Sequence, residues 1–227
     1  MIEATYIDHM GSDLSVVNAA RVSFGKKSVW NWSKELESGT GNGNTLKEGD
    51  TKLINYLAKH SHISPFGHAF VSLHVKAPIY VARQLVKHSF LRWNEVSRRY
   101  VDDEPEFYTP DVWRGRAEDV KQGSGAECKS QYFPGIYAEE VNAKAVEDYR
   151  KMLQQGVAPE QARMILPQST MTEWYWSGSL DAFARMCNLR LKTDTQYETR
   201  LVAQQIHDII FPRFPVSWEA LVGGEFQ

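Results

Sequence analysis

An apolar helical pattern gives way to charged and hydroxyl-bearing residues in Gln84-Leu-Val-Lys-His-Ser-Phe-Leu-Arg-Trp-Asn-Glu-Val-Ser-Arg-Arg-Tyr100. The apolar spacing predicts a helix over 79–88, which stacks Gln84 and His88 four residues apart on one face. We expect residues 93–99 to be extended, and the period of two then puts Glu95, Ser97 and Arg99 on one side. A carboxylate, a hydroxyl and a guanidinium that converge suit an anionic, hydrogen-bonding ligand such as a nucleotide.

Outward from this stretch, strand and helix patterns alternate irregularly. Alternating apolar residues over 70–75 predict a strand that Pro78 ends, and Pro78 also suits the first turn of the following helix. The same reasoning predicts strands at 2–9 and 170–176, and helices at 13–20, around 53–57, and at 134–155, 160–166, 180–191 and 195–211. No repeat or linker divides the chain into two cores, so we predict one mixed α/β domain over 1–227.

Two glycine-rich segments interrupt this pattern and are predicted to be flexible loops. They span about 26–50 and 114–131. The first contains the run Gly39-Thr-Gly-Asn-Gly43. Because no buried strand precedes this run, we interpret it as a loop rather than as a phosphate-binding turn.

Composition bounds the class of protein. With 227 residues, 42% of them hydrophobic, the chain is long enough for one sizeable core. Its 26 basic and 28 acidic residues create no basic field, which argues against duplex nucleic acid as a partner. No apolar run approaches the roughly 18 residues of a membrane span, and no signal-type run opens the sequence. Cys128 and Cys187 have neither disulfide nor zinc spacing, so a reduced, cytoplasmic setting without a membrane partner is expected.

The histidines invite a metal hypothesis, because His60, His62, His68 and His74 crowd one region. No cysteine or carboxylate accompanies them at a spacing typical of metal ligands. We therefore interpret them as hydrogen-bonded structural residues rather than zinc ligands, and we predict no metal site.

The quoted stretch resembles the signature of the flavin-dependent thymidylate synthases. That signature reads Arg-His-Arg, seven residues and Ser, with a Glu two positions before the Ser and an Arg two positions after it, a spacing also found here. Lys87 and Ser89 stand in place of the two signature arginines. Four further blocks are similar to family segments in the same order, at 11–24, 60–68, 162–167 and 188–190. The signature is kept at His88, Glu95, Ser97 and Arg99.

The resemblance implies a mostly antiparallel central sheet with flanking helices, and a set of nucleotide-binding side chains. Ser97 and Arg99, with help from Arg163, would contact the phosphate. Arg190 would face the uracil carbonyl and stabilise charge that develops on the ring, so Arg190 and Ser97 are the predicted catalytic residues. The other predicted substrate contacts are Gln84, Lys87, Glu95 and Arg98.

Other interpretations of these residue types stay open. An isolated arginine is usually a surface residue or a salt-bridge partner. Ser97 has no His–Asp pair at a spacing that would activate it as a nucleophile, so we favour a hydrogen-bonding role, with a turn or capping serine as the alternative. Cys187 lies on an apolar helical stripe and is predicted to be a core residue. The family needs no cysteine nucleophile.

The resemblance also implies FAD, held by side chains of neighbouring subunits rather than by a glycine-rich loop. Four positions where the family places flavin-contacting Asn, Arg, Asn and His residues hold Ser179, Asp181, Arg185 and Asp194 here. Either flavin binds through different contacts, or the use of the cofactor has changed. The predicted FAD contacts are Ser23, His62, Ser64, Lys87, His88, Ser89, Glu95, Arg185 and Leu189.

The activity that the resemblance implies is C5 methylation of dUMP to dTMP by a homotetramer. Methylenetetrahydrofolate would donate the one-carbon unit, reduced FAD would carry it and supply hydride, and NADPH would be the upstream reductant. Two alternatives follow from the altered flavin positions. One is C5 hydroxymethylation of dUMP or modification of dCMP, and the other is a catalytically degenerate protein that binds a nucleotide.

Overall fold

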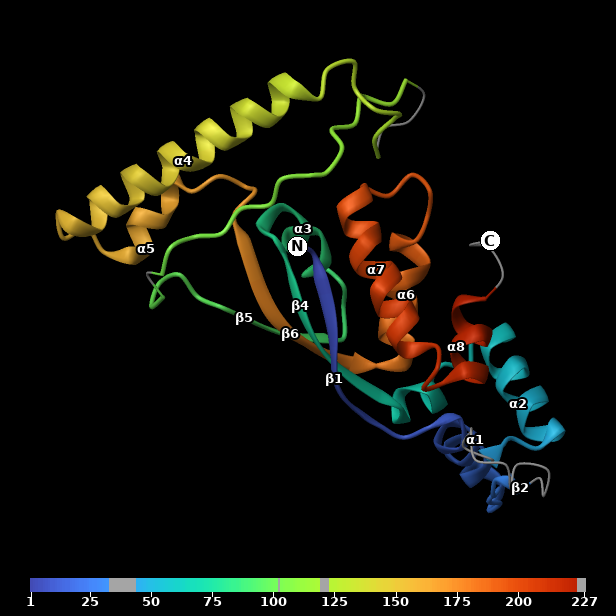
Figure 1. The fold of residues 1–227 in the computed structure, drawn as a ribbon. Helices are drawn as coiled ribbons and strands as arrows, with labels where there is room; N and C mark the ends of the chain where they lie inside the picture. Colours follow the sequence, from blue (N-terminus) through green and yellow to red (C-terminus); the bar gives the residue numbers. More distant parts are fainter. Residues whose placement is uncertain (33–43, 102, 119–122, 224–227) are drawn as a thin grey trace.

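The computed structural model describes residues 1–32, 44–101, 103–118 and 123–223, and a four-stranded sheet lies at its centre (Figure 1). The strands are β1 (Glu3–Met10), β4 (Phe70–Pro78), β5 (Leu91–Glu95) and β6 (Met171–Ser179). Their spatial order is β1-β4-β6-β5, and all neighbouring pairs are antiparallel. The predicted mixed α/β fold with a central antiparallel sheet is therefore confirmed.

Side-chain alternation explains why β4 lies in the middle of the sheet. Val71, Leu73 and Val75 are fully buried, whereas the residues between them are only partly buried. In β6, Trp174 and Trp176 lie opposite Val75 and Leu73, so large aromatic side chains pack beside aliphatic ones across the pair. These paired residues of β4 and β6 supply much of the apolar surface that is buried under the helices.

Gly178 allows β5 to lie against β6. A Cβ atom at Gly178 would overlap the side chain of Leu91 and would lie 3.0 Å from the carbonyl oxygen of Phe90. Phe90 has a φ of 66°, a left-handed conformation, in the turn that leads into β5. A larger residue at 178 would therefore displace β5, which ends at Glu95.

Helices flank the sheet. Figure 1 shows α6 and α7 beside it, α2 and α8 beyond them, and α4 with α5 on the opposite side. None of the described helices is both long enough and apolar enough to cross a membrane. The helices are α1 (Asp13–Arg21), α2 (Glu48–Lys59), α3 (Ile79–Leu85), α4 (Tyr132–Gln154), α5 (Pro159–Ala162), α6 (Leu180–Arg190), α7 (Tyr197–Ile210) and α8 (Pro215–Val222). The 3-10 helices are η1 (Val22–Phe24), η3 (Ser64–His68) and η4 (Arg163–Ile165), and the strands β2 (Asn31–Trp32) and β3 (Asn44–Thr45) form a separate pair.

The apolar stripe predicted for 180–191 is confirmed in α6. Leu180, Phe183, Ala184, Cys187 and Leu191 are all buried. Burial raises the pKa of the Cys187 thiol well above its ordinary value, which keeps it protonated and unreactive. The prediction that Cys187 belongs to the core is confirmed.

Two predicted elements beside the quoted stretch are shorter than expected. The predicted helix over 79–88 ends at Leu85, and a turn occupies 86–90. The predicted extended segment 93–99 ends as a strand at Glu95. The amide of Val96 still donates to the carbonyl of Glu173, but the amide of Tyr100 donates to the carbonyl of Ser97 and closes a turn. The alternation of side chains between the two faces of the extended segment therefore stops before Ser97.

The sequence pattern did not predict α8, which follows Pro212. Its first turn is anchored by a distant residue, because the amides of Val216 and Ser217 donate to the carboxylate of Asp13 at 3.0 and 2.9 Å. Asp13 is 4% exposed, so a buried charge at the start of α1 is satisfied by the start of α8.

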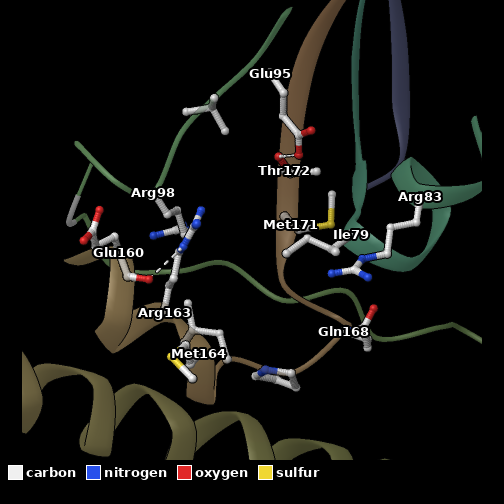
Figure 2. A pocket seen from close by; sticks show the side chains of 13 residues that line it. Ile79, Arg83, Glu95, Arg98, Glu160, Arg163, Met164, Gln168, Met171 and Thr172 are labelled. Carbon is white, nitrogen blue, oxygen red and sulfur yellow. Dashed lines mark hydrogen bonds between the residues drawn. The ribbon is translucent and has the colours of Figure 1, made fainter. Parts of the chain in front are cut away.

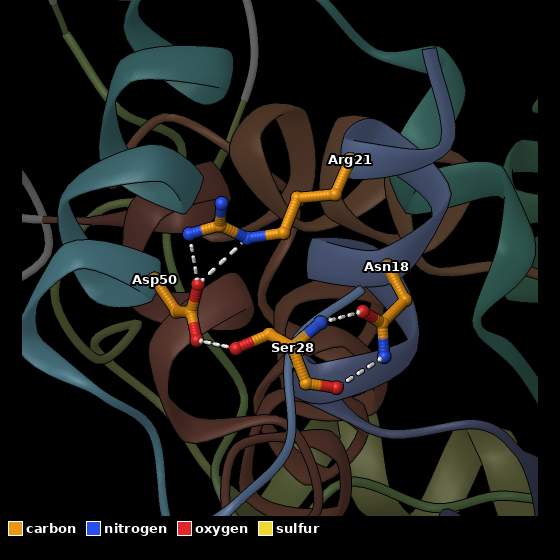
Figure 3. Close-up of polar contacts among 4 residues, drawn as sticks. All are labelled: Asn18, Arg21, Ser28 and Asp50. Atoms are coloured by element: carbon orange, nitrogen blue, oxygen red, sulfur yellow. Dashed lines mark hydrogen bonds and ion pairs between the residues drawn. The ribbon is translucent and has the colours of Figure 1, made fainter. Parts of the chain in front are cut away.

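Part of the predicted loop over 26–50 is held in place by buried polar contacts (Figure 3). The Asp50 carboxylate, 1% exposed, accepts hydrogen bonds from the Arg21 guanidinium and the Ser28 hydroxyl. Asn18 pairs with the Ser28 backbone at 2.7 and 3.2 Å. Helix α2 begins at Glu48, two residues before the approximate end predicted for this loop, and the glycine-rich run at 39–43 lies outside the described residues.

The second predicted loop, 114–131, contains paired backbone. Gly115 donates to the carbonyl of Ala126 at 2.7 Å, Gly125 donates to Gly115, and Cys128 donates to Trp113. Residues 119–122 lie outside the described part of the chain. The segment therefore folds back on itself through short antiparallel pairing that the glycine pattern did not indicate.

Candidate functional site

A cavity of about 400 Å³, which we call the arginine cavity, lies between α3, the end of β5, the start of β6, and α5 (Figure 2). Three guanidinium groups line it, from Arg83, Arg98 and Arg163. Glu95 and Glu160 also line it. The apolar and neutral lining residues are Ile79, Val96, Met164, Leu166, Pro167, Gln168, Met171 and Thr172.

Local structure explains how these side chains come together. Ile79 and Arg83 are four residues apart on α3 and therefore face the same cavity. Glu95 is held at the end of β5, where it accepts hydrogen bonds from Thr172 Oγ1 at 2.7 Å and Trp93 Nε1 at 3.0 Å. Arg163 is the first residue of η4 and directly follows α5, the short helix that begins with Pro159.

The charges of this cavity favour an anion. Arg98 donates to the backbone carbonyl of Asp103 at 2.9 Å, and Arg163 donates to the backbone carbonyl of Glu160 at 3.2 Å. Among the described residues, Arg83, Arg98 and Arg163 have no carboxylate within ion-pair distance. Three positive charges thus face one space whose two carboxylates do not neutralise them by contact, an arrangement suited to a phosphate.

Of the predicted substrate contacts, Glu95, Arg98 and Arg163 line the arginine cavity. Arg83 and Gln168 also line it and were missed. The spacing of four residues between Ile79 and Arg83 could have predicted that both face one cavity. That prediction would have required treating the solvent-facing side of α3 as part of a binding site.

Arg190, His88 and Gln84 form a second group between α3 and α6. Arg190 Nε donates to His88 Nε2 at 3.0 Å, and Arg190 Nη2 donates to the carbonyl oxygen of Gln84 at 3.1 Å. The Gln84 amide in turn donates to the Gln196 side chain. The structure therefore joins three of the predicted residues, although His88 lies beyond the end of α3.

His88 is the acceptor in this contact, so its Nε2 must be unprotonated. Burial, with the Arg190 charge as a second cause, lowers the pKa of His88 to about 4. Burial also lowers the pKa of Arg190. A neutral imidazole consequently holds the Arg190 guanidinium in one orientation at neutral pH.

Ser97 and Arg99 form a third, local group. Arg99 Nε donates to Ser97 Oγ at 3.1 Å within the turn that follows β5. Neither residue lines the arginine cavity. The expected convergence of Glu95, Ser97 and Arg99 is therefore wrong within one chain, because the turn breaks the alternation and Arg98 faces the cavity instead.

The predicted FAD contacts are dispersed over the chain. Ser23, His62 and Ser64 are exposed in and around η1 and η3, at the end of the sheet where β4 begins. The arginine cavity lies at the other end, where β6 begins. Lys87, Ser89, Arg185 and Leu189 are also exposed. One chain does not bring the predicted cofactor and substrate residues together.

The altered flavin positions form a polar network of their own. Ser179 Oγ donates to Asp181 Oδ1 at 2.6 Å, and Arg185 Nη2 lies 3.1 Å from Asp181 Oδ2. The Arg185 guanidinium also lies 5.2 Å from the centre of the exposed Phe90 ring. Arg185 stays half-exposed despite its ion pair with Asp181, and Lys87 and the Phe90 ring are exposed as well. Two accessible cations and a flat ring fit a diphosphate and a planar ring system.

The histidines predicted to be structural make aromatic and polar contacts. His60 and His62 pack near Tyr56, and His74 Nε2 lies 3.0 Å from a carboxylate oxygen of Glu173. Within the described ranges, no cluster of three or more His, Cys, Asp or Glu side chains could hold a metal ion.

The fold and the arginine cavity together define a class, an α/β protein with an antiparallel sheet and, beside it, a cavity whose charges suit a small anionic ligand. Residues 5–216 match the family described as Thymidylate synthase complementing protein, Thy1. The chain belongs to this family, the flavin-dependent thymidylate synthases, which is a family of enzymes.

Relatives support this assignment over most of their length. The chain is 38% identical over 214 residues to the flavin-dependent thymidylate synthase of Thermus thermophilus, covering 94% of this chain and 73% of that protein. It is 37% identical over 218 residues to the enzyme of Kosmotoga olearia, covering 95% and 88% of the two chains.

A solved structure is similar to the whole fold. The UMP/dUMP methylase PolB from Streptomyces cacaoi, bound with 5-Br UMP, aligns with a TM-score of 0.80 and 28% identity, covering 97% of this chain and 93% of that one. The same protein bound with 5-Br dUMP aligns with a TM-score of 0.78 and 30% identity.

Proposed function

We infer that this chain methylates C5 of dUMP to form dTMP, with methylenetetrahydrofolate as the one-carbon donor. The observation that carries this inference is the arginine cavity, in which three guanidinium groups without a carboxylate partner among the described residues face a nucleotide-sized space. Arg98 and Arg163 hold the phosphate, and Glu95 offers carboxylate oxygens to hydrogen-bond donors of the nucleotide.

Arg190 acts on the uracil ring. Its guanidinium is oriented by His88 and by the Gln84 carbonyl, so it can meet the uracil carbonyl without reorganising. As negative charge develops on that oxygen, a fixed cation in a partly buried setting stabilises it more than water would. No enzyme nucleophile is required, and Ser97 serves as a hydrogen-bonding residue.

Reduced FAD, when bound, carries the one-carbon unit and supplies hydride, with NADPH as the upstream reductant. Lys87 and Arg185 supply positive charge for its diphosphate, and the exposed Phe90 ring supplies a flat surface. Ser23, His62 and Ser64 would contact it from a neighbouring subunit, since they lie at the other end of the sheet from the arginine cavity.

The active form is a homotetramer in this proposal. Substrate and cofactor residues at opposite ends of one sheet support a site completed by other subunits. The first half of α4 also leaves a row of large apolar side chains in solvent, whereas Ala145 and Tyr149 of the same stripe are buried. The exposed residues are Tyr132, Phe133, Tyr137 and Val141.

Tritium release from dUMP labelled at C5 tests the reaction, because methylation must remove that hydrogen. Wild-type protein with FAD, NADPH and methylenetetrahydrofolate should release tritium and give a product with the mass of dTMP. The absence of release under conditions where dUMP binds would leave a nucleotide-binding protein without this activity.

A second candidate keeps the nucleotide and changes the product. The network of Ser179, Asp181 and Arg185, at positions where the family contacts flavin, favours it. Hydroxymethylation of dUMP would appear in the same assay as a product of different mass, and modification of dCMP would appear when C5-labelled dCMP replaces dUMP.

A further inference from the structure

The arginine cavity contains charges of both signs that do not pair with one another. Glu95 lines it together with the guanidinium groups of Arg83, Arg98 and Arg163. Within the part of the chain that the structure describes, no ion pair joins Glu95 to any of these arginines. An ion pair of this kind would neutralise part of the positive charge that a phosphate needs. The contacts that hold Glu95 apart therefore matter for binding an anion.

Two neutral donors hold both oxygens of the Glu95 carboxylate. Thr172 Oγ1 donates to Glu95 Oε1 at 2.7 Å, and Trp93 Nε1 donates to Glu95 Oε2 at 3.0 Å. Because each oxygen has its own donor, the rotation of the carboxylate is fixed as well as its position. Hydrogen bonds to an ionised group are stronger than an exposed ion pair, so these two contacts outweigh the attraction of an arginine in the same cavity.

The sheet fixes both of these donors. Thr172 is buried on β6, where it lies opposite Ala77 of β4. The Trp93 ring stacks on Trp174 with 4.2 Å between ring centres and 19° between ring planes, and it meets Trp176 edge-on. Since Trp174 and Trp176 are buried, they hold the indole N–H of Trp93 in one direction. The carboxylate thus meets a preformed pair of donors.

Two of the arginines also have neutral partners. Arg98 and Arg163 each donate to a backbone carbonyl, at 2.9 and 3.2 Å. Figure 2 shows the Glu95 carboxylate meeting Thr172, apart from the guanidinium groups of Arg98 and Arg163. Neutral partners therefore orient the charges of this cavity without cancelling them, and the positive charge stays available to a phosphate.

We propose that Thr172 and Trp93 are positioning residues that keep the anion site open by holding Glu95 away from the arginines. Without the Thr172 hydroxyl, the Glu95 carboxylate turns and pairs with a guanidinium of the same cavity, of which Arg98 is the nearest in sequence, and it then competes with the phosphate. This inference rests on the proposed function, in which that phosphate belongs to dUMP. Neither Thr172 nor Trp93 is among the predicted substrate or cofactor contacts.

A double-mutant cycle between Thr172 and Glu95 tests the proposal, with inorganic phosphate as the probe and phosphorus NMR titration as the measurement. We expect Thr172→Val to weaken phosphate binding roughly three- to tenfold. In the Glu95→Gln background, the same substitution should change the affinity by less than about twofold, because a neutral amide does not compete for an arginine. Thr172→Ser keeps the hydroxyl and should keep the wild-type affinity.

Ser177→Ala is the matched control, because it also removes a hydroxyl hydrogen bond from β6, the one to Ser72 at 2.9 Å, but lies outside the arginine cavity. It should leave the phosphate affinity unchanged. An equal loss for Thr172→Val in the two backgrounds would overturn the proposal, since it would mean a direct contact with phosphate or a general disturbance of the sheet. Failure of the wild-type protein to bind phosphate would overturn it as well.

Trp93→Phe repeats the comparison on the second donor and serves if Thr172→Val does not fold, because it keeps an aromatic ring beside Trp174 and removes the N–H. It should weaken phosphate binding when Glu95 is present and not in the Glu95→Gln background; an equal loss in both would overturn the proposal. Tritium release from dUMP by the wild-type protein reports on the proposed function separately. The expected coupling in phosphate binding without tritium release would contradict the proposed function alone.

Discussion

The arginine cavity and a second cavity, which we call the tyrosine cavity, are similar in size, about 400 and 440 Å³, but they differ in how their charged side chains are paired. The tyrosine cavity lies between α3 and the start of α7, and Tyr80, Tyr108 and Tyr197 line it. The arginine cavity has three guanidinium groups without an ion-pair partner among the described residues. The tyrosine cavity has one guanidinium, that of Arg114, which forms an ion pair with Glu198. The comparison shows that two cavities of similar volume can suit different ligands, because the guanidinium groups of one have no carboxylate partner and that of the other has one.

Removing the charge of Glu198 tests this difference in charge pairing most directly. Glu198→Gln leaves the Arg114 guanidinium buried without its carboxylate, which should lower the free energy of unfolding by about 3 kcal/mol. Urea unfolding measures this effect. Glu104→Gln is the control, because the Glu104–Arg150 pair is exposed and its loss should change the free energy of unfolding by less than about 1 kcal/mol. Equal effects in the two variants would contradict the account.

Removing a guanidinium from the arginine cavity should weaken the nucleotide. Arg163→Ala deletes a charge-assisted contact of about 1.5–3 kcal/mol, so the affinity for dUMP should fall roughly 10- to 150-fold while the protein stays folded. Calorimetric titration with dUMP measures the loss. Arg150→Ala removes an exposed arginine outside the cavity and should leave the affinity as it is; unchanged dUMP binding in Arg163→Ala would remove Arg163 from the site.

Arg190→Ala should separate ring chemistry from phosphate binding. Because Arg190 lies with His88 rather than in the arginine cavity, the variant should lose tritium release more than it loses dUMP affinity. Comparing kcat with the dissociation constant of dUMP decides this. An equal loss of both would mean that Arg190 only binds the nucleotide.

His88 should make stability depend on pH in a defined window. Its pKa lies at about 4 in the folded chain, against an ordinary value of 6.5, so the unfolded chain takes up the proton first as pH falls. The contribution of His88 is therefore fully present above pH 6.5 and is lost progressively as pH falls toward 4. Urea unfolding across this window should show a shallower decline for His88→Gln, which cannot take up a proton; identical slopes would rule the contribution out.

The smallest effect concerns exposed charge on the flavin side. Lys87 and Ser89 are exposed, so Lys87→Arg with Ser89→Arg should tighten FAD by no more than about 1 kcal/mol, or roughly fivefold. Titration followed by flavin fluorescence measures this change. We expect the unmodified protein to lose FAD partly on purification; tight retention would show that Arg185 already replaces the missing arginines.

Much of the fold could be predicted because periodicity and burial coincide in its core. In β4 and α6, the apolar residues that set the period are also the buried ones. The end of β5 could not be predicted, because it depends on a hydrogen bond to Glu173 and on the turn at Ser97. The anchor of α8 lies 203 residues away, at Asp13, a distance no local pattern can bridge.

The site was harder to predict than the fold. The similar family blocks led us to predict roles for Arg163 and Arg190 but could not show that these residues lie in different groups. Arg83 and the aromatic residues of the tyrosine cavity belong to no motif, because packing alone brings α3, the start of α7 and the loop residues Tyr108 and Trp113 together. Convergence of residues distant in sequence is a property of the folded chain.

Gln168 gives the two cavities a common wall, and this has a thermodynamic consequence. A ligand that shifts the Gln168 side chain in one cavity changes the shape and hydrogen bonding of the other. Such a coupling is reciprocal, so the factor by which a ligand of the arginine cavity changes the affinity for a ligand of the tyrosine cavity must equal the factor in the opposite direction. Whichever ligand binds first, this one amide side chain would then change the affinity for the second ligand by the same factor.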